Sequence, residues 1–534
     1  MEQLYKTAKY LLDKYGNALS EKVIFQIDKS FEGDDYRVEK EGKKFVLLGN
    51  SVVAFNAAVG KVMRLGDAAC DKTFCFEKKL RGTYFANHFY NFYHTAPIEK
   101  VFDYMEELAL WGQNVFSLWF DMHHFSSIND PHAQEMIVRM EKYYKKAKEL
   151  GMKTVYGNQG NEYYYESEQR LRAECSTESG LYQAKPVGFY YTELCPSKPE
   201  SVTLLLESFR ELMKRFQKVG IDYLGFGPYD QGGCTCKDCY PWGANGFFKI
   251  SKLKAAIAKE YFPEVKIILS AWRIGAFCHE EWEPFLTAVK NDGDWFDCML
   301  VDVVAEHPDE LYALGYPVIC FPEISMTASP WGGYGATPIS ATMKWFFASK
   351  WTRCDGGWSY SEGLFEDINK IVTLELFRDS TLEVKDIVKE YTTCYFKGDF
   401  AEEIAELILE LEQTVWRNVF DKDGNNCDYP SGVQTELPIV KIHQPGNIEK
   451  IANRFIELNE KLPNVIKENW RYRMLYIRAL GDLELIRNGG VPNVKTDEIY
   501  GQLADIYLTE ENTDYVVAPF TRASFLRNRS EGAL

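Results

Sequence analysis

A regular alternation of apolar runs and helical patterns between residues 81 and 380 constrains the fold more than any other feature of the chain. Short apolar runs typical of buried strands recur eight times, and a segment with helical spacing follows each of them. The expected strands are 82–86, 114–120, 152–156, 221–226, 265–271, 297–303, 317–321 and 356–360. Because a parallel strand needs a crossover helix to reach its neighbour, eight such units predict a closed (β/α)8 barrel. An open doubly wound sheet is the alternative.

The segments on either side of the barrel predict two further domains. Residues 1–80 combine a helical pattern, a strand over 23–27, a hairpin over 36–48 and a second helix after Asn50-Ser51, which together indicate a small α/β domain. Residues 381–534 are mostly helical in pattern and predict a C-terminal helical domain that is a candidate surface for a homodimer. We therefore assign the catalytic barrel to residues 81–380.

Composition limits the partners and the compartment. The formal net charge of −17 disfavours nucleic acid and anionic membrane surfaces as partners, and the 15% aromatic content fits stacking on sugars. No apolar run is long enough to span a membrane, and the N-terminus lacks the apolar segment of a signal peptide. The thirteen cysteines are scattered and odd in number, which favours reduced thiols and hence a cytoplasmic protein.

Carboxylates, Trp, Tyr and His dominate the positions where the predicted strands end. In a (β/α)8 barrel these ends meet on the face that carries the chemistry. Carboxylates supply the acid, base or nucleophile of glycoside hydrolysis, and aromatic rings offer flat apolar faces to sugars. We assign catalysis to Asp230 as general acid, Glu323 as base or nucleophile, and Glu362 as a third candidate. The expected substrate-binding residues are Asn87, His88, Trp119, Asp121, Tyr229, Trp272, Arg273, Asp302, Trp358 and Tyr360.

A cluster of cysteines follows the fourth strand, on the same loop as Asp230. Three thiols spaced Cys234-x-Cys236-x2-Cys239 are typical of a tetrahedral metal site that lacks one ligand, and Cys195 could supply the fourth. The cluster is a candidate structural zinc site, with free thiols as the alternative. The carboxylate chemistry itself requires no cofactor.

Three stretches resemble glycoside hydrolases that place a small α/β domain before a (β/α)8 barrel, the family 20 hexosaminidase-like and family 67 α-glucuronidase-like enzymes. They are YRVEKEGKKFVLLGNSVVAFNAAVGKVMR, RGTYFANHFYNFYH with the NVFSLWFD that follows, and ELCPSKPES with GPYDQGGCTCKDCYPW and the later WSYSEGLFEDINK. The resemblance implies an acid after the fourth strand, where Asp230 stands, and further carboxylates after later strands, where Glu323 fits.

The same resemblance leaves the sugar open. The hexosaminidases carry an Asp-Glu pair where this chain has Asp230-Gln231, and a uronic acid would need a cation, for which Arg273 and then Arg81 are candidates. We therefore predict an exo-acting glycoside hydrolase for small oligosaccharides or glycosides. The alternatives are a barrel that binds carbohydrate without cleaving it and a metal-dependent hydrolase or isomerase.

Overall fold

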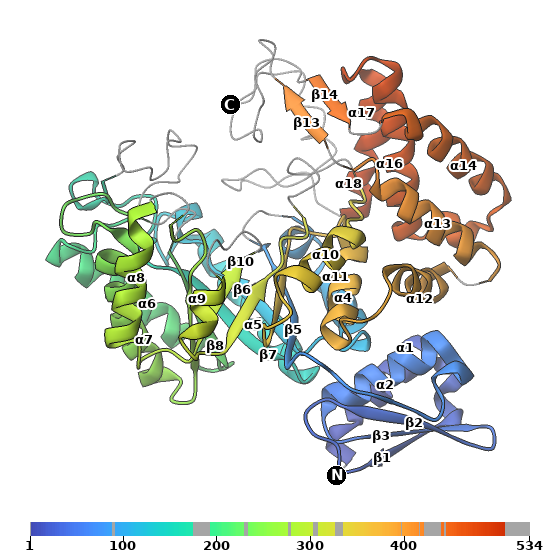
Figure 1. Cartoon of the computed structure of the whole chain (residues 1–534), viewed down its shortest axis with the longest axis horizontal. Coiled ribbons are helices and arrows are strands. Elements are labelled where there is room, and N and C mark those ends of the chain that lie inside the picture. Colours follow the sequence, from blue (N-terminus) through green and yellow to red (C-terminus); the bar gives the residue numbers. More distant parts are fainter. Residues whose placement is uncertain are drawn as a thin grey trace.

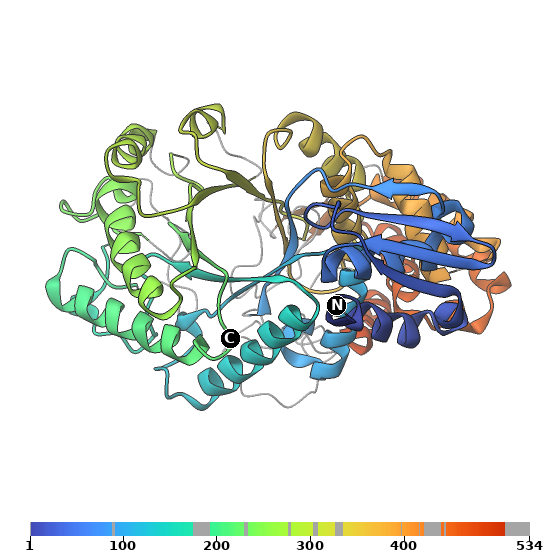
Figure 2. The ribbon, with the colours of Figure 1, turned by 90° about the horizontal axis from the view of Figure 1, so that it is seen from below.

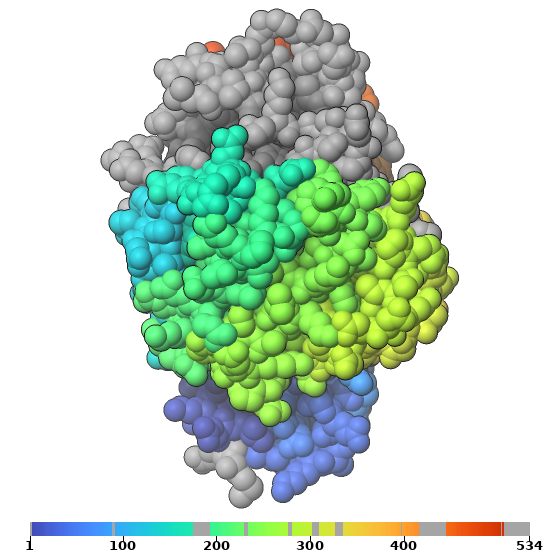
Figure 3. Space-filling view, turned by 90° about the vertical axis from the view of Figure 1, so that its left-hand side faces the viewer, coloured from blue at the N-terminus to red at the C-terminus, as the bar shows by residue number. Residues whose placement is uncertain are grey.

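The computed structural model describes residues 2–87, 91–174, 193–228, 233–275, 279–302, 308–325, 335–396, 398–415, 417–420, 439–442 and 445–507. Three parts follow one another along the chain (Figure 1): a small N-terminal domain, a central barrel and a helical C-terminal part. In the space-filling view of Figure 3 the N-terminal domain, in blue, lies against one end of the barrel.

The N-terminal domain is a four-stranded sheet in the order β1-β3-β2-β4. β1 runs parallel to β3, and β2 pairs antiparallel with β3 and β4. The Oγ of Ser51 accepts a hydrogen bond from the backbone N–H of Ala54 at 3.0 Å and caps α2, as expected from the sequence. The bounds are α1 Lys6–Tyr15, β1 Val23–Ile27, β2 Tyr36–Glu41, β3 Lys44–Gly49, α2 Val52–Leu65 and β4 Lys72–Phe74.

Eight parallel strands form a closed barrel in sequence order, and β12 returns to pair with β5. Figure 2 looks along the barrel and shows its helices outside the ring of strands. The predicted (β/α)8 fold and its two flanking parts are confirmed. The strands are β5 Leu80–Phe85, β6 Val115–Trp119, β7 Lys153–Gln159, β8 Tyr223–Gly227, β9 Lys266–Ser270, β10 Cys298–Asp302, β11 Val318–Phe321 and β12 Gly356–Ser361.

One helix follows each barrel strand, and a short helix, α3, precedes the first of them. A π-helical turn at Gly243–Phe247 leads into α7. The helices are α3 Phe92–Thr95, α4 Ile98–Leu110, α5 Pro131–Glu149, α6 Pro199–Phe216, α7 Phe248–Tyr261, α8 Trp282–Asp292, α9 Pro308–Ala313, α10 Ser340–Ser349 and α11 Asp367–Arg378.

Alternate residues of the strands fill the barrel interior and form a cluster of their own, apart from the larger core between strands and helices. Small and aliphatic side chains such as Val155 and Ile268 occupy its middle and lower part. Three large aromatic side chains lie at or next to the carboxyl ends of their strands, namely Tyr84, Trp119 and Tyr360, and Trp358 lies two residues before Tyr360 on β12. The interior is therefore packed below and aromatic at the mouth.

The C-terminal part is a stack of helices with one small antiparallel ribbon. Buried ion pairs attach it to the other two parts: Arg471 contacts Asp367 of α11 at 2.8 Å, and Lys61 of α2 contacts Glu390 at 2.8 Å. The elements are α12 Val384–Phe396, α13 Phe400–Glu412, β13 Arg417–Phe420, β14 Ile439–Ile442, α14 Ile448–Lys461, α15 Asn464–Lys467, α16 Trp470–Arg487, α17 Val494–Gly501 and α18 Leu503–Tyr507. In the part of the chain that the structure describes, no helix combines the length and apolar character needed to cross a membrane.

Candidate active site at the carboxyl ends of the barrel strands

Glu323 and Glu362 follow two adjacent strands, β11 and β12. The backbone pairing between β11 and β12 continues past the end of β11. Glu323 forms a β-bridge to Tyr360, and the backbone N–H of Tyr360 donates to the carbonyl of Pro322 at 2.8 Å. Side chains alternate along a strand, and Phe321 and Tyr360 belong to the interior cluster. Glu323 and Glu362 stand two residues further along these rows, so both lie on the inward side of the mouth.

We call Glu323, Tyr360 and Glu362 the β11–β12 arc. Both glutamates are partly exposed. One Glu323 oxygen accepts hydrogen bonds from the backbone N–H and the hydroxyl of Ser325, at 3.0 and 3.1 Å. The hydroxyl of Tyr360 donates to Glu362 at 2.8 Å. Burial and the neighbouring charge of Glu323 raise the pKa of Glu362 well above its ordinary value. The two carboxyl groups are therefore close enough to influence each other's protonation.

An aromatic floor lies beneath these carboxyl groups. Tyr84 stacks on Tyr360 with 5.5 Å between ring centroids, and Phe321 meets both rings edge-on at 5.8 Å. Trp358 lies two residues before Tyr360 on the same inward row. Flat apolar rings below a pair of acids suit the C–H face of a pyranose.

The part of the mouth beyond β5 carries a buried polar network on β6 and β7. We call Trp119, Asp121, His123 and Glu162 the β6–β7 arc. The Trp119 indole donates to Glu162 at 2.7 Å, and the Asn158 amide donates to the other Glu162 oxygen at 2.5 Å. Burial raises the pKa of Glu162 to about 8, although nearby positive charges act to lower it. Lys254 of α7 donates to Asn158 at 2.8 Å, and burial lowers the pKa of Lys254 to about 8.

His123 stands between two carboxylates in this arc. Asp121 Oδ1 lies 2.7 Å from its Nδ1, and Glu193 Oε1 lies 2.9 Å from its Nε2. Burial disfavours the charged ring, but the two carboxylates outweigh that effect and hold the pKa of His123 well above its ordinary value. Ligand atoms of Asp121, His123 and Glu162 lie within 4.8 Å of one another. A cation there would have to displace a hydrogen bond, because both ring nitrogens already face carboxylates.

Glu162 and Glu193 stand among the carboxylates that the sequence places after the third strand, but neither was assigned a role in the site. Both lie in the long connection between β7 and α6, which has no periodic pattern. The one available signal was the position of Glu162 three residues beyond the end of β7, which is where a barrel carries functional side chains.

Four of the remaining predicted residues lie at or just beyond the ends of β5, β9 and β10. Asn87 turns outward, and its amide contacts the sulfur of Met136 on α5 at 2.9 Å. Trp272 is partly buried, and the exposed Arg273 lies beside its ring at 5.5 Å with a positive φ of 60°. Asp302 is the last residue of β10. His88, Tyr229 and Asp230 lie outside the described residues.

The suggestion that Arg81 could hold a uronic acid is wrong. Arg81 lies at the amino end of β5, the opposite end of the barrel, where it pairs with Asp34 at 2.7 Å and donates to the carbonyl of Lys78 at 2.8 Å. It joins the N-terminal domain to the barrel instead.

The four predicted cysteines come together. Cys195, Cys234, Cys236 and Cys239 are buried, with all four sulfur atoms within 4.8 Å of one another. They lie in the loops that follow β7 and β8.

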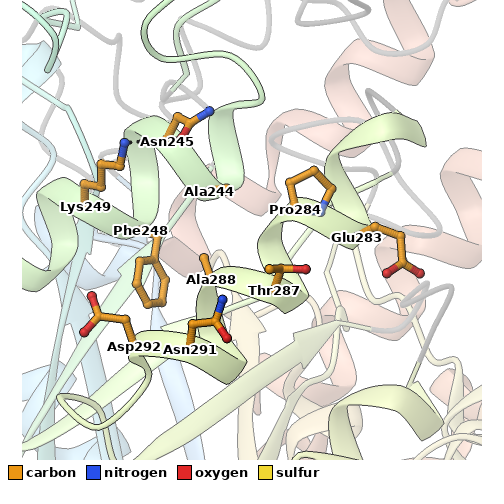
Figure 4. Close-up of a pocket in the computed structure, with 10 residues that line it drawn as sticks. All are labelled: Ala244, Asn245, Phe248, Lys249, Glu283, Pro284, Thr287, Ala288, Asn291 and Asp292. Carbon is orange, nitrogen blue, oxygen red and sulfur yellow. Dashed lines mark hydrogen bonds between the residues drawn. The ribbon is translucent and has the colours of Figure 1, made fainter.

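A cavity of about 560 Å³ lies on the outside of the barrel, between α7 and α8 (Figure 4). Phe248 and Lys249 line it from α7, and Thr287 and Asn291 line it from α8. It is a groove between two outer helices away from the strand ends, and it holds none of the predicted catalytic residues.

The chain shares its fold with solved glycoside hydrolases that are built on a (β/α)8 barrel. No protein-family model and no curated protein sequence matches it. Among solved structures, it is similar to a family 89 glycoside hydrolase from Clostridium perfringens in complex with GlcNAc-α-1,4-galactose. The TM-score is 0.58 and the identity 13%, over 95% of this chain and 64% of that one.

Two further solved structures share the fold. The same family 89 enzyme in complex with a 2-acetamido-dideoxynojirimycin gives a TM-score of 0.59 at 13% identity, over 95% of this chain and 65% of that one. A family 138 enzyme that targets pectin rhamnogalacturonan II gives a TM-score of 0.51 at 11% identity, over 94% of this chain and 72% of that one. This chain thus spans about two thirds of the length of the family 89 enzyme. The predicted resemblance to barrel glycoside hydrolases is confirmed as a likeness of fold.

Proposed function

We propose that this protein is an exo-acting glycoside hydrolase that cleaves small oligosaccharides or glycosides by carboxylate chemistry. The observation that carries the proposal is the β11–β12 arc. Two carboxyl groups on adjacent strands lie above an aromatic floor, and the pKa of Glu362 is raised by burial and by the charge of Glu323. A site that keeps one carboxyl group protonated beside an ionised one has the elements of glycosidic bond cleavage.

Each carboxyl group has a role in this proposal. Glu323, ionised, attacks the anomeric carbon or activates the water that does so. Asp230, on the loop after β8, protonates the leaving oxygen. Glu362, protonated, hydrogen-bonds the sugar and lowers the negative charge next to Glu323. In the β6–β7 arc, Glu162 holds Trp119 in place through a hydrogen bond, and Trp119 forms a wall of the sugar site.

The first substrate to test is an α-linked N-acetylhexosaminide. The family 89 enzyme with the same fold was solved in complex with GlcNAc-α-1,4-galactose, in a form with two glutamates replaced by glutamine. That disaccharide also supports an exo mode of action. Uronides and β-N-acetylhexosaminides complete the panel, because this chain has Asp230-Gln231 where hexosaminidases carry an Asp-Glu pair.

The test is turnover of aryl glycosides by the wild type, Asp230→Asn and Glu323→Gln, with Glu207→Gln on the exposed face of α6 as the matched control. We expect one glycoside to be cleaved, with losses of about a thousandfold or more in both site variants and none in the control. Full activity in both site variants would overturn the assignment. Ligand-dependent thermal shifts without turnover on the whole panel would favour the non-catalytic barrel.

The metal-dependent alternative makes a different prediction. If the Asp121, His123 and Glu162 group held a catalytic ion, turnover would vanish with a chelator and return with added metal while the thermal stability stayed constant. We expect turnover to persist at chelator concentrations that leave the thermal stability unchanged, because both nitrogens of His123 face carboxylates.

A further inference from the structure

Four buried cysteines from two loops meet beside the barrel mouth. Cys195 lies on the connection between β7 and α6, and Cys234, Cys236 and Cys239 lie on the connection between β8 and α7. The sulfur of Cys195 is 3.6 Å from that of Cys234, 3.7 Å from that of Cys236 and 3.8 Å from that of Cys239. Because the three distances are nearly equal, Cys195 is not paired with any one of the other cysteines in particular.

These separations are those of ligands around a shared ion. Zinc binds thiolates at about 2.3 Å in a tetrahedron, which places the sulfur atoms about 3.8 Å apart along its edges. A disulfide would instead bring two sulfur atoms to about 2 Å from each other, with the other two further away. We propose that Cys195, Cys234, Cys236 and Cys239 bind one zinc ion with all four thiolates.

The surroundings of the sulfur atoms fit this assignment. The backbone N–H of Glu174 contacts Cys234 Sγ at 3.4 Å, and the hydroxyl of Ser197 lies 3.0 Å from Cys195 Sγ and 3.4 Å from Cys236 Sγ. Donors around ligating sulfur are the outer shell that a thiolate site needs. The buried pair Cys320 and Cys354, with sulfur atoms 3.6 Å apart, offers only two ligands and forms no such group among the described residues.

The ion would join two loops that carry parts of the candidate active site. Asn161, next to Glu162, donates to the carbonyls of Leu194 and Gly233, both at 3.0 Å, and accepts from the backbone N–H of Gly233 at 3.0 Å. The same two loops thus meet at Asn161 and at the cysteines, and Asp230 precedes Cys234 by four residues. Four thiolates leave no open position, so the ion is structural and takes no part in the reaction. The zinc assignment stands independently of the proposed hydrolase activity.

The experiment uses the full chain purified under reducing conditions without chelator. We expect elemental analysis to find one zinc per chain in the wild type and in Cys354→Ser, and well under half of that in Cys195→Ser and Cys236→Ser. Thiol modification of the wild type should release the zinc, and replacement by Co²⁺ should give the visible bands of tetrahedral thiolate-bound cobalt. These wild-type measurements do not depend on whether a variant folds. Wild-type protein without zinc and without cobalt bands, or zinc retained in full by folded Cys195→Ser, would overturn the proposal.

Discussion

The two sides of the barrel mouth use carboxylates in opposite ways. On the β11–β12 arc, Glu323 and Glu362 are partly exposed and stand over stacked aromatic rings. On the β6–β7 arc, Asp121, His123 and Glu162 are fully buried. Asp121 pairs with His123, and Glu162 accepts a hydrogen bond from Trp119. A partly exposed carboxyl group can reach a substrate, whereas a buried and paired one fixes the position of other side chains. The proposed function therefore places the chemistry on the first arc and expects the second to position other side chains.

The largest effect is expected for Glu323→Gln. The amide keeps the shape of the side chain but cannot attack the anomeric carbon or take a proton, so kcat should fall by about a thousandfold or more. KM and the thermal midpoint should change little. Steady-state kinetics beside a thermal melt separate the two effects, and a loss of stability with intact kcat would remove Glu323 from the chemistry.

On the β6–β7 arc the expected cost falls on stability. Trp119→Phe removes the indole donor of a fully buried Glu162, which should destabilise the fold by about 1–3 kcal/mol. Trp358→Phe, a similarly buried indole on the inward face of β12, is the matched control. Denaturant unfolding of both variants measures the difference. Equal losses would show that the Trp119 hydrogen bond contributes nothing of its own.

Glu162→Gln tests the same arc through pH. Burial raises the pKa of Glu162 from 4.5 to about 8, so the folded state holds a proton that the unfolded state releases. The wild type therefore loses stability as the pH rises from about 4.5 to about 8, while the amide has no proton to hold. The variant should gain about 4 kcal/mol relative to the wild type between pH 5 and pH 9. Parallel pH dependences in urea melts would contradict a raised pKa.

The smallest effect is expected for Glu362→Gln. If Glu362 acts in its protonated form, an amide imitates it, and kcat should fall by about tenfold or less. The activity of the wild type should decline as the pH rises through the raised pKa of Glu362, and the variant should lose that limb of the profile. A thousandfold loss in Glu362→Gln would instead make this residue the acid or the nucleophile.

Much of the fold could be predicted because local signals agree with the tertiary structure. Most barrel strands contain a short apolar run, and all eight predicted strands overlap the observed ones. The strand β4 was missed because it has three residues, two of them exposed, and thus no apolar pattern. Arg81 was a wrong candidate because it stands at the start of the first barrel strand, and the amino ends of the strands lie on the face opposite the site.

The site was harder to predict than the fold. Glu323 and Glu362 could be found because each stands just beyond a strand. Glu162 depends on Trp119, 43 residues earlier in the chain, and on the Asn158 and Lys254 pair, a contact set that no local pattern encodes. Asn87 was expected to face sugar, but Ala86 takes the inward position and Asn87 contacts α5. Alternation along the strand decides which of two adjacent residues faces the mouth.

The most direct test of the central claim is azide rescue of Glu323→Ala on the aryl glycoside that the wild type cleaves. If Glu323 delivers the attack on the anomeric carbon, this variant is inactive, and azide restores turnover with a glycosyl azide of inverted configuration as the product. A Glu323→Ala variant that cleaves the glycoside at the wild-type rate without azide would contradict the account.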